Sequence, residues 1–179
     1  MFLVAIIAVV LVVKIGTAAP GASAASNLKY GGLPSWLPKS TVPANGDLDA
    51  SPTHPQLGIE GNTMRVTLHG SVMLVTMSGP TVPPFTTPPP PITTATVTLA
   101  FVPESGRVPI RAKDFLLLDG NGIALHPQSF VGGQSALAPS PGQPVSLQIT
   151  EVMAVGAGSI KWSPGGTAVA EWEFTVEND

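Results

Sequence analysis

The residues best suited to chemistry are a group of soft metal ligands near position 70. Met64, His69, Met73 and Met77 lie within fourteen residues, and thioether sulfur and imidazole are ligands that suit Cu(I). On one continuous strand Met64 faces away from the other three, whereas a bulge at Gly70 reverses the parity beyond it. Because methionine is also a common core residue, a periplasmic copper-binding or chaperone protein is the alternative hypothesis, and we predict no metal site.

No residue set supports a catalytic mechanism. The segment Gly133-Gln134-Ser135-Ala136-Leu137 lacks the final glycine of a nucleophile elbow. Glu171 and Glu173 lie two positions apart on one strand face, about 7 Å from each other, and we interpret them as solubilising residues rather than a glycosidase pair. Cysteine is absent, which excludes thiolate metal sites and catalytic thiols. We expect no enzyme activity, no catalytic residue and no cofactor.

The charge composition argues against polyanionic partners. The chain has eight Lys and Arg, eleven Asp and Glu, and a net charge of −3. Because the basic residues are spread thinly along the sequence, we expect neither a phosphate-binding face nor a nucleic-acid partner.

The N-terminus indicates export. Residues 2–13 are all apolar, and a helix of twelve residues spans about 18 Å, less than the roughly 30 Å of a bilayer core. This length is typical of a signal peptide, and an Ala-x-Ala pattern predicts cleavage near Ala24 or Ala25. Because Lys14 follows the apolar run and no basic residue precedes it, an uncleaved membrane anchor over residues 2–19 is equally open. Residues 1–25 are therefore predicted to be a signal peptide or an anchor, and the remainder extracytoplasmic or secreted.

Two proline-rich stretches are candidates for partner binding. Residues 26–61 have no hydrophobic period and are predicted to be a linker, in which Trp36 is an isolated aromatic. Residues 78–93 hold seven prolines and are predicted to be a loop rather than a central strand. Its candidate contact residues are an aromatic and a polyproline run, Phe85, Pro88, Pro89, Pro90 and Pro91.

Beyond residue 61 the hydrophobic pattern has a period of two residues. Alternation is clear over residues 63–69, 71–77, 94–102, 144–150 and 167–176. Strands with one apolar face form sheets that bury those faces against each other. Residues 62–179 are therefore predicted to be an all-β antiparallel sandwich of about seven to nine strands, in which Val97, Leu147 and Trp172 share one interior.

One hairpin and two later features carry a family resemblance. Asp119-Gly120-Asn121-Gly122 joins two apolar runs and supplies the positive φ angles that hairpins need. Together with Pro141-Gly142-Gln143 and Trp172-Glu173-Phe174, the segment from Phe115 to Gly122 resembles the small exported immunoglobulin-like proteins of mycobacteria and related bacteria. The resemblance covers residues 62–177 and departs from that pattern at the proline-rich insertion. It implies an exported sandwich from families that mostly lack known enzymatic activity.

These observations favour a non-catalytic protein of the cell envelope. We expect a module that binds another envelope or membrane protein, or an accessory subunit of a membrane complex, with Trp36, Phe85 and residues 88–91 as the contact candidates. Loops at the ends of a sandwich are where such folds usually bind.

Overall fold

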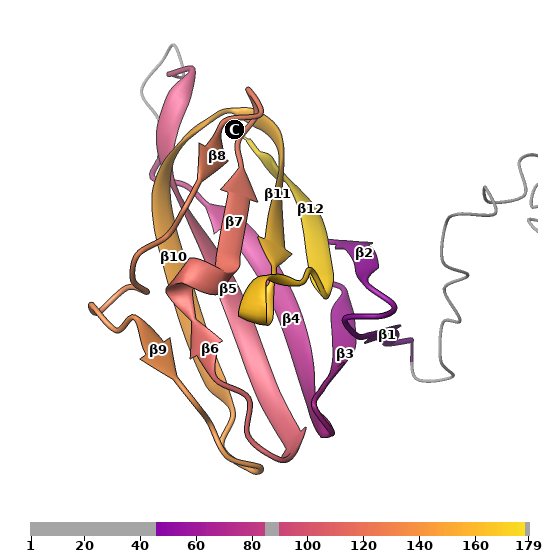
Figure 1. Cartoon of the computed structure of the whole chain (residues 1–179). Helices are drawn as coiled ribbons and strands as arrows, with labels where there is room; N and C mark the ends of the chain where they lie inside the picture. Colours follow the sequence, from indigo (N-terminus) through magenta and orange to yellow (C-terminus); the bar gives the residue numbers. More distant parts are fainter. Residues whose placement is uncertain (1–45, 85–89, 178–179) are drawn as a thin grey trace, which may run out of the picture. The chain divides into compact units, whose positions relative to one another are not determined.

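Two facing sheets of five strands each build the domain (Figure 1). The computed structural model describes residues 46–84 and 90–177. The first sheet has the order β1 (Leu48–Ala50), β3 (Thr63–Leu68), β4 (Ser71–Thr81), β5 (Ile92–Ser105) and β10 (Val145–Ala154). The second has the order β2 (Gln56–Ile59), β12 (Ala170–Val176), β11 (Gly156–Trp162), β7 (Phe115–Leu118) and β8 (Ala124–Leu125). The predicted all-β sandwich is confirmed.

Smaller elements close one side of the sandwich. A two-stranded sheet pairs β6 (Ile110–Arg111) with β9 (Ala136–Leu137). Two short 3-10 turns, η1 (Ala112–Asp114) before β7 and η2 (Pro164–Gly166) after β11, lie side by side (Figure 1).

The alternating residues form the core, as the period-two pattern predicts. On β5 the inward residues are Ala95, Val97, Leu99 and Phe101, each at most 1% exposed. Val97, Leu147 and Trp172 belong to one buried cluster that draws on both sheets. Burying apolar area from both sheets is the main force that holds such layers together.

Four aromatic rings bridge the layers. The ring centroid of Trp162 on β11 lies 5.6 Å from that of Phe101 on β5, in an edge-to-face arrangement. Trp162 also stacks on Phe115 of β7 at 6.0 Å, and Phe115 meets Phe130 edge-on at 6.1 Å. Such pairs contribute about 0.5–1.5 kcal/mol each beyond their buried area, so this cluster stabilises the contact between the two sheets.

The bulge or bend predicted at Gly70 is a hairpin turn between two strands. β3 and β4 form a hairpin in which Leu68 pairs with Ser71, so the chain reverses over His69 and Gly70. Their φ angles are 49° and 80°, which is the left-handed pair that a tight type I′ turn requires. Because the turn resets the alternation, β4 buries its odd-numbered residues, Met73, Val75 and Met77.

The predicted linker over residues 26–61 is wrong where the structure describes its end. β1 pairs in parallel with β3, and β2 pairs in parallel with β12. These strands have three and four residues, too few to show a hydrophobic period between prolines. With β6, β8 and β9, which have two residues each, they raise the number of strands in the described residues to twelve, above the predicted seven to nine.

The proline-rich loop is shorter than the predicted 78–93, because β4 continues to Thr81 and β5 begins at Ile92. β4 accommodates Pro80 at an irregularity in the ladder, since Ser78 pairs with Thr98 but Thr81 pairs with Thr96. β4 therefore has one extra residue at this point, as in a β-bulge. Pro80 has no N–H to donate and can occupy the strand there, because the ladder is interrupted.

The predicted signal peptide or anchor, residues 1–25, and Trp36 lie outside the described residues. Within residues 46–84 and 90–177, no helix has the length and apolar character needed to cross a membrane.

The two core tryptophans provide a matched pair of stability tests. Trp162 and Trp172 are both fully buried. Trp172 Nε1 donates to the carbonyl oxygen of Asn62 at 3.0 Å, whereas Trp162 Nε1 has no hydrogen-bond partner among the described residues. Because a lost bond to a buried carbonyl costs about 1–2 kcal/mol, we expect Trp172→Phe to lower the free energy of unfolding by that much more than Trp162→Phe. Urea denaturation of both variants measures the difference, and equal losses would contradict the assigned role of the Asn62 bond.

Candidate functional site

A hollow lies on the outer face of the second sheet. This groove has a volume of about 660 Å³ and runs from edge strand β2 across β12 and β11 to the β7–β8 turn. Its wall and floor residues are Ile59, Glu60, Leu118, Asp119, Gly120, Gly122, Ala157, Gly158, Ser159, Glu171, Glu173, Phe174 and Thr175. We call this set the acidic groove, because three carboxylates on its rim come from Glu60, Glu171 and Glu173.

Apolar side chains stand directly beside two of these carboxylates. In the parallel pairing of β2 with β12, Leu57 lies opposite Glu171 and Ile59 lies opposite Glu173. Leu57 and Ile59 are 59% and 60% exposed, although both are large aliphatic residues. An edge strand therefore presents apolar surface next to negative charge, which is a combination typical of binding sites rather than of a purely solubilising face.

Hydrogen bonds fix the β2 end of the groove. Ser159 Oγ donates to Glu171 Oε1 at 2.8 Å, which orients that carboxylate. The backbone N–H of Glu60 donates to the carbonyl oxygen of Glu173 at 2.9 Å. The backbone N–H of Ile59 donates to Asn62 Oδ1 at 3.0 Å, and the same Asn62 holds the Trp172 indole through its carbonyl oxygen. The rim is therefore rigid before any ligand arrives.

Asp119 closes the opposite end of the groove. Its Oδ1 accepts hydrogen bonds from the backbone N–H groups of Asn121 and Ile123, at 2.9 and 2.8 Å. Its Oδ2 accepts from the N–H of Ala154 on β10 at 3.1 Å. Burial raises the pKa of this carboxyl, but the three backbone donors outweigh burial and hold the pKa below its ordinary value of 3.8. Asp119 therefore acts as a structural anion that ties the β7–β8 turn to the other sheet.

Gly120 permits this contact between the sheets. A Cβ at this position would collide with the carbonyl of Val155, so only glycine lets the turn approach the β10–β11 junction. The Asp119 and Asn121 positions are confirmed as turn residues, and the predicted hairpin forms between β7 and β8.

The polar side chains of the groove lining are mainly carboxylates. Its one serine donates its hydroxyl to Glu171, and no histidine is among its lining residues in the described chain. A hydroxyl activated for attack needs a base that accepts its proton and an orienting partner for that base. What the lining does offer is carboxylate oxygen beside aliphatic surface.

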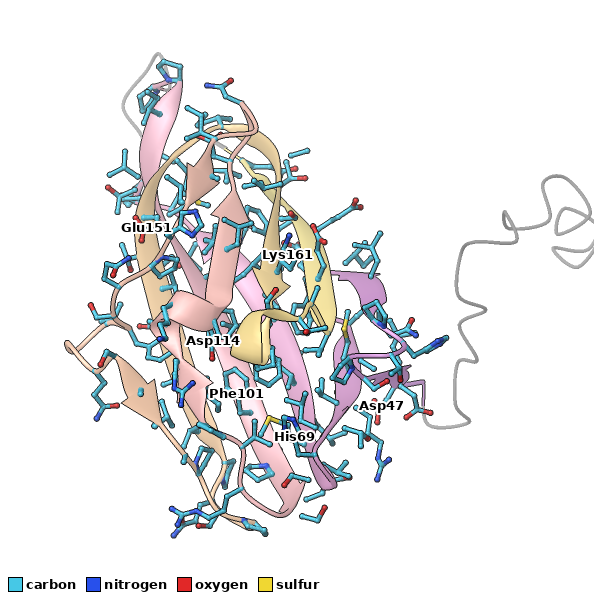
Figure 2. The ribbon with its side chains drawn as sticks, in the orientation of Figure 1. Asp47, His69, Phe101, Asp114, Glu151 and Lys161 are labelled. Atoms are coloured by element: carbon cyan, nitrogen blue, oxygen red, sulfur yellow. The ribbon has the colours of Figure 1, made fainter. Side chains whose placement is uncertain are left out.

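The copper hypothesis finds no assembled ligand set. Met64, Met73 and Met77 are at most 1% exposed and pack in the core between the sheets. His69 is exposed at the tip of the β3–β4 turn (Figure 2). Met64, Met73 and Met77, on the strands that flank the turn, point into the core, whereas His69 at the tip of the turn is exposed. The histidine and the methionines therefore lie apart.

Of the predicted partner-binding residues, only two belong to the described chain. Trp36, Phe85, Pro88 and Pro89 lie outside it. Pro90 and Pro91 are exposed, and the carbonyl oxygen of Pro91 accepts from the N–H of Val155 at 3.1 Å. The base of the proline-rich loop is thus attached next to the β10–β11 junction, at the same end of the sandwich as the β7–β8 turn (Figure 1).

Sequence reasoning missed the apolar half of the groove. Leu57 and Ile59 lie in the segment interpreted as linker, where the alternation Gln56-Leu57-Gly58-Ile59 was the available signal. Four residues are too few to distinguish a strand from chance. The carboxylates Glu171 and Glu173 were correctly placed on an outward face, but their apolar neighbours come from 114 positions earlier in the chain.

Asp119 makes the stability of the domain depend on pH. A carboxyl whose folded-state pKa is depressed stabilises the fold above its unfolded pKa, and this contribution is lost as the pH falls through the folded-state pKa. We expect Asp119→Asn to lower the free energy of unfolding by about 2 kcal/mol at pH 7. The difference from the unmodified protein should shrink as the pH falls below 3.8. Denaturation over a pH series tests this, and a constant difference would show that the Asp119 charge is not involved.

Comparison with known proteins gives only a distant likeness. No family model matches the chain, and no curated protein matches it. Among solved structures, the chain is similar to MPT63, a secreted protein from Mycobacterium tuberculosis, with 15% sequence identity and a TM-score of 0.46. The likeness covers 68% of this chain and 98% of that one. The neighbour is a secreted mycobacterial protein, as the resemblance stated above anticipates, but a likeness at this level carries no argument about activity or partners.

Proposed function

We propose that the protein is an exported, non-catalytic binding module of the cell envelope, and that its acidic groove holds an extended segment of another protein. The observation that carries this proposal is the row of exposed aliphatic side chains beside carboxylates, Leu57 with Glu171 and Ile59 with Glu173. The partner segment is one in which Lys or Arg alternates with apolar residues. In an extended chain such residues point to opposite sides, which matches a groove with one apolar wall and one acidic wall.

Charge complementarity favours a basic partner over a second copy of the chain. Among the described residues the only ion pair joins Arg65 and Glu104, on the first sheet. Among the described residues, the groove carboxylates of Glu60 and Glu173 form no ion pair. An incoming Lys or Arg would therefore meet negative charge that the protein itself does not neutralise, and this steers association as well as orientation.

Preorganisation supports binding without a large ordering cost. The lining residues come from paired strands and from two turns that are hydrogen-bonded in place. A rigid site loses little conformational entropy when a ligand docks. The described base of the proline-rich loop, Pro90 and Pro91, is exposed and offers a second contact at the same end of the sandwich. Phe85, Pro88 and Pro89 lie outside the described residues and stay candidate contact residues.

The finer fold assignment and the location belong to the same proposal. We assign the sandwich to the immunoglobulin-like class for two reasons. In the sheet of order β2-β12-β11-β7-β8, the last two strands of the chain, β11 and β12, are neighbours, and the early strand β2 pairs in parallel with β12. The chain also crosses from one sheet to the other between β5 and β7 and between β10 and β11. Export is supported by the apolar run of residues 2–13, whether the segment is cleaved near Ala24 or Ala25 or retained as an anchor.

Peptide selection tests the groove directly. We expect a phage-displayed library of random dodecapeptides, panned against the full chain in mild detergent, to enrich sequences that alternate Lys or Arg with apolar residues. The double variant Glu171→Gln/Glu173→Gln should bind the enriched synthetic peptides about tenfold more weakly in fluorescence anisotropy, because each exposed charge pair contributes about 0.2–1 kcal/mol.

The matched control is Glu104→Gln, which removes an exposed carboxylate from the other sheet and should leave the peptide Kd unchanged. Enrichment of acidic or uncharged peptides, or equal affinity of the double variant, would refute the groove as the binding site. Enrichment of peptides that match segments of this chain would instead indicate that the groove binds a second copy of the chain.

A further inference from the structure

The basic residues of the domain gather on one side, although they are thinly spread in the sequence. The described chain contains five Lys and Arg, which are Arg65, Arg107, Arg111, Lys113 and Lys161. All but Arg65 line two neighbouring pockets beside η1 and η2. Thin spacing along the sequence therefore does not prevent four of these residues from lying near one another in space.

The larger pocket, of about 380 Å³, combines three cationic side chains with neutral donors. Arg111 comes from β6, Lys113 from η1 and Lys161 from β11, while His126 and Ser163 belong to adjoining connections. Figure 2 shows Lys161 and Asp114 on the face of the sandwich that carries η1 and η2. Cations from three separate elements converge here, which a linear reading of the sequence does not reveal. We call this site the basic pocket.

The cationic side chains of the basic pocket form no internal ion pair. Within the described residues, the side chains of Arg111, Lys113 and Lys161 make no ion pair and no hydrogen bond, and the one ion pair joins Arg65 to Glu104. Lys161 does lie opposite Glu171 in the pairing of β11 with β12. Arg107, in the smaller adjoining pocket, donates to the carbonyl oxygen of Ala138 at 3.0 Å. Arg111 and Lys113 are therefore available for a ligand, and Lys161 is available although a carboxylate lies beside it.

One carboxylate belongs to the pocket lining and sets a limit on the ligand. Asp114 lines both pockets, and its backbone carbonyl oxygen accepts from the N–H of Ser163 at 2.7 Å. This bond ties η1 to the loop that leads into η2. With three cations and one carboxylate, the lining keeps an excess of positive charge, which favours a compact anion of more than one charge.

We propose that the basic pocket binds the phosphate group of a phosphorylated small molecule. Phosphate oxygens accept several charge-assisted hydrogen bonds at once, and guanidinium and ammonium groups are their usual donors. The pocket volume falls in the range of small-molecule sites, and half-buried Leu116 adds apolar surface for the non-phosphate part. This site shares no lining residue with the acidic groove, although Lys161 lies opposite Glu171, and the proposal does not depend on the function assigned to that groove.

Titration with pyrophosphate tests the proposal. When pyrophosphate is titrated into the full chain in mild detergent at constant ionic strength, we expect calorimetry to show a saturable heat of binding. A titration with sodium chloride in place of pyrophosphate should show none. Arg111→Gln and Lys161→Gln should each weaken binding by about tenfold or more, because a charge-assisted bond contributes about 1.5–3 kcal/mol. Asp114→Asn should tighten binding, since it removes the negative charge from the lining.

Arg65→Gln is the matched control, because it removes an exposed cation on the opposite sheet and should leave the affinity unchanged. Cosedimentation with phosphatidic acid vesicles, compared with phosphatidylcholine vesicles, separates the two sources of phosphate. Binding to phosphatidic acid that Arg111→Gln abolishes identifies a lipid headgroup, whereas binding of pyrophosphate alone identifies a soluble ligand. Absence of saturable binding, or equal affinities for Arg111→Gln, Lys161→Gln and Arg65→Gln, would overturn the proposal.

Discussion

The contact between Phe101, Trp162 and Phe115 determines which side chains of the second sheet can reach solvent. These three rings come from β5, β11 and β7 and close the space between the sheets. Because successive strand residues point to opposite faces, burying Trp162 forces Lys161 outward, and burying Phe115 does the same for Leu116. In the same way Trp172 places Glu171 and Glu173 outside. The core therefore positions both candidate sites, even though no core side chain has a polar role in either.

Edge strands and turns then complete what the central strands begin. β2 is only four residues long, yet it sets the exposed Leu57 and Ile59 beside Glu171 and Glu173. Its position depends on parallel pairing with β12 and on Asn62, which binds the backbone of Ile59 and the indole of Trp172. At the other end, Asp119 joins the β7–β8 turn to β10 through Ala154. Two polar residues thus connect the surface of one sheet to the core and to the opposite sheet.

The sequence was informative wherever a local rule controls the structure. Alternation over residues 94–102 and 144–150 identified the buried faces of β5 and β10, and Asp119 to Gly122 identified a hairpin from its need for positive φ. The sequence also predicted a bulge or bend at Gly70, but not that the chain reverses there, because His69-Gly70 is not one of the Asn-Gly or Asp-Gly pairs that usually indicate a two-residue hairpin. Where pairing involves distant segments, as for β2 with β12, no local pattern exists to be recognised.

The candidate sites were harder to predict than the fold for the same reason. Arg107, Arg111 and Lys113 lie within seven residues of one another, which was a visible signal of local positive charge. Lys161 joins them only because β11 pairs with β7, so that Lys161 lies opposite Leu116. A count of charges along the chain does not show which residues are neighbours in space, whereas the pairing of β11 with β7 brings Lys161 close to residues about fifty positions earlier.

The two candidate sites meet on the second sheet at one pair of opposite charges. In the pairing of β11 with β12, Lys161 lies directly opposite Glu171, so a residue of the basic pocket and a residue of the acidic groove are cross-strand neighbours. Ser159, two residues from Lys161 on the same face of β11, donates its hydroxyl to Glu171 Oε1, whereas Lys161 and Glu171 form no ion pair among the described residues. The Ser159 hydroxyl therefore competes with Lys161 for this carboxylate. The full chain has a net charge of −3, but that sum does not show where charges of opposite sign meet, and ligand preference at either site depends on the local arrangement of strands.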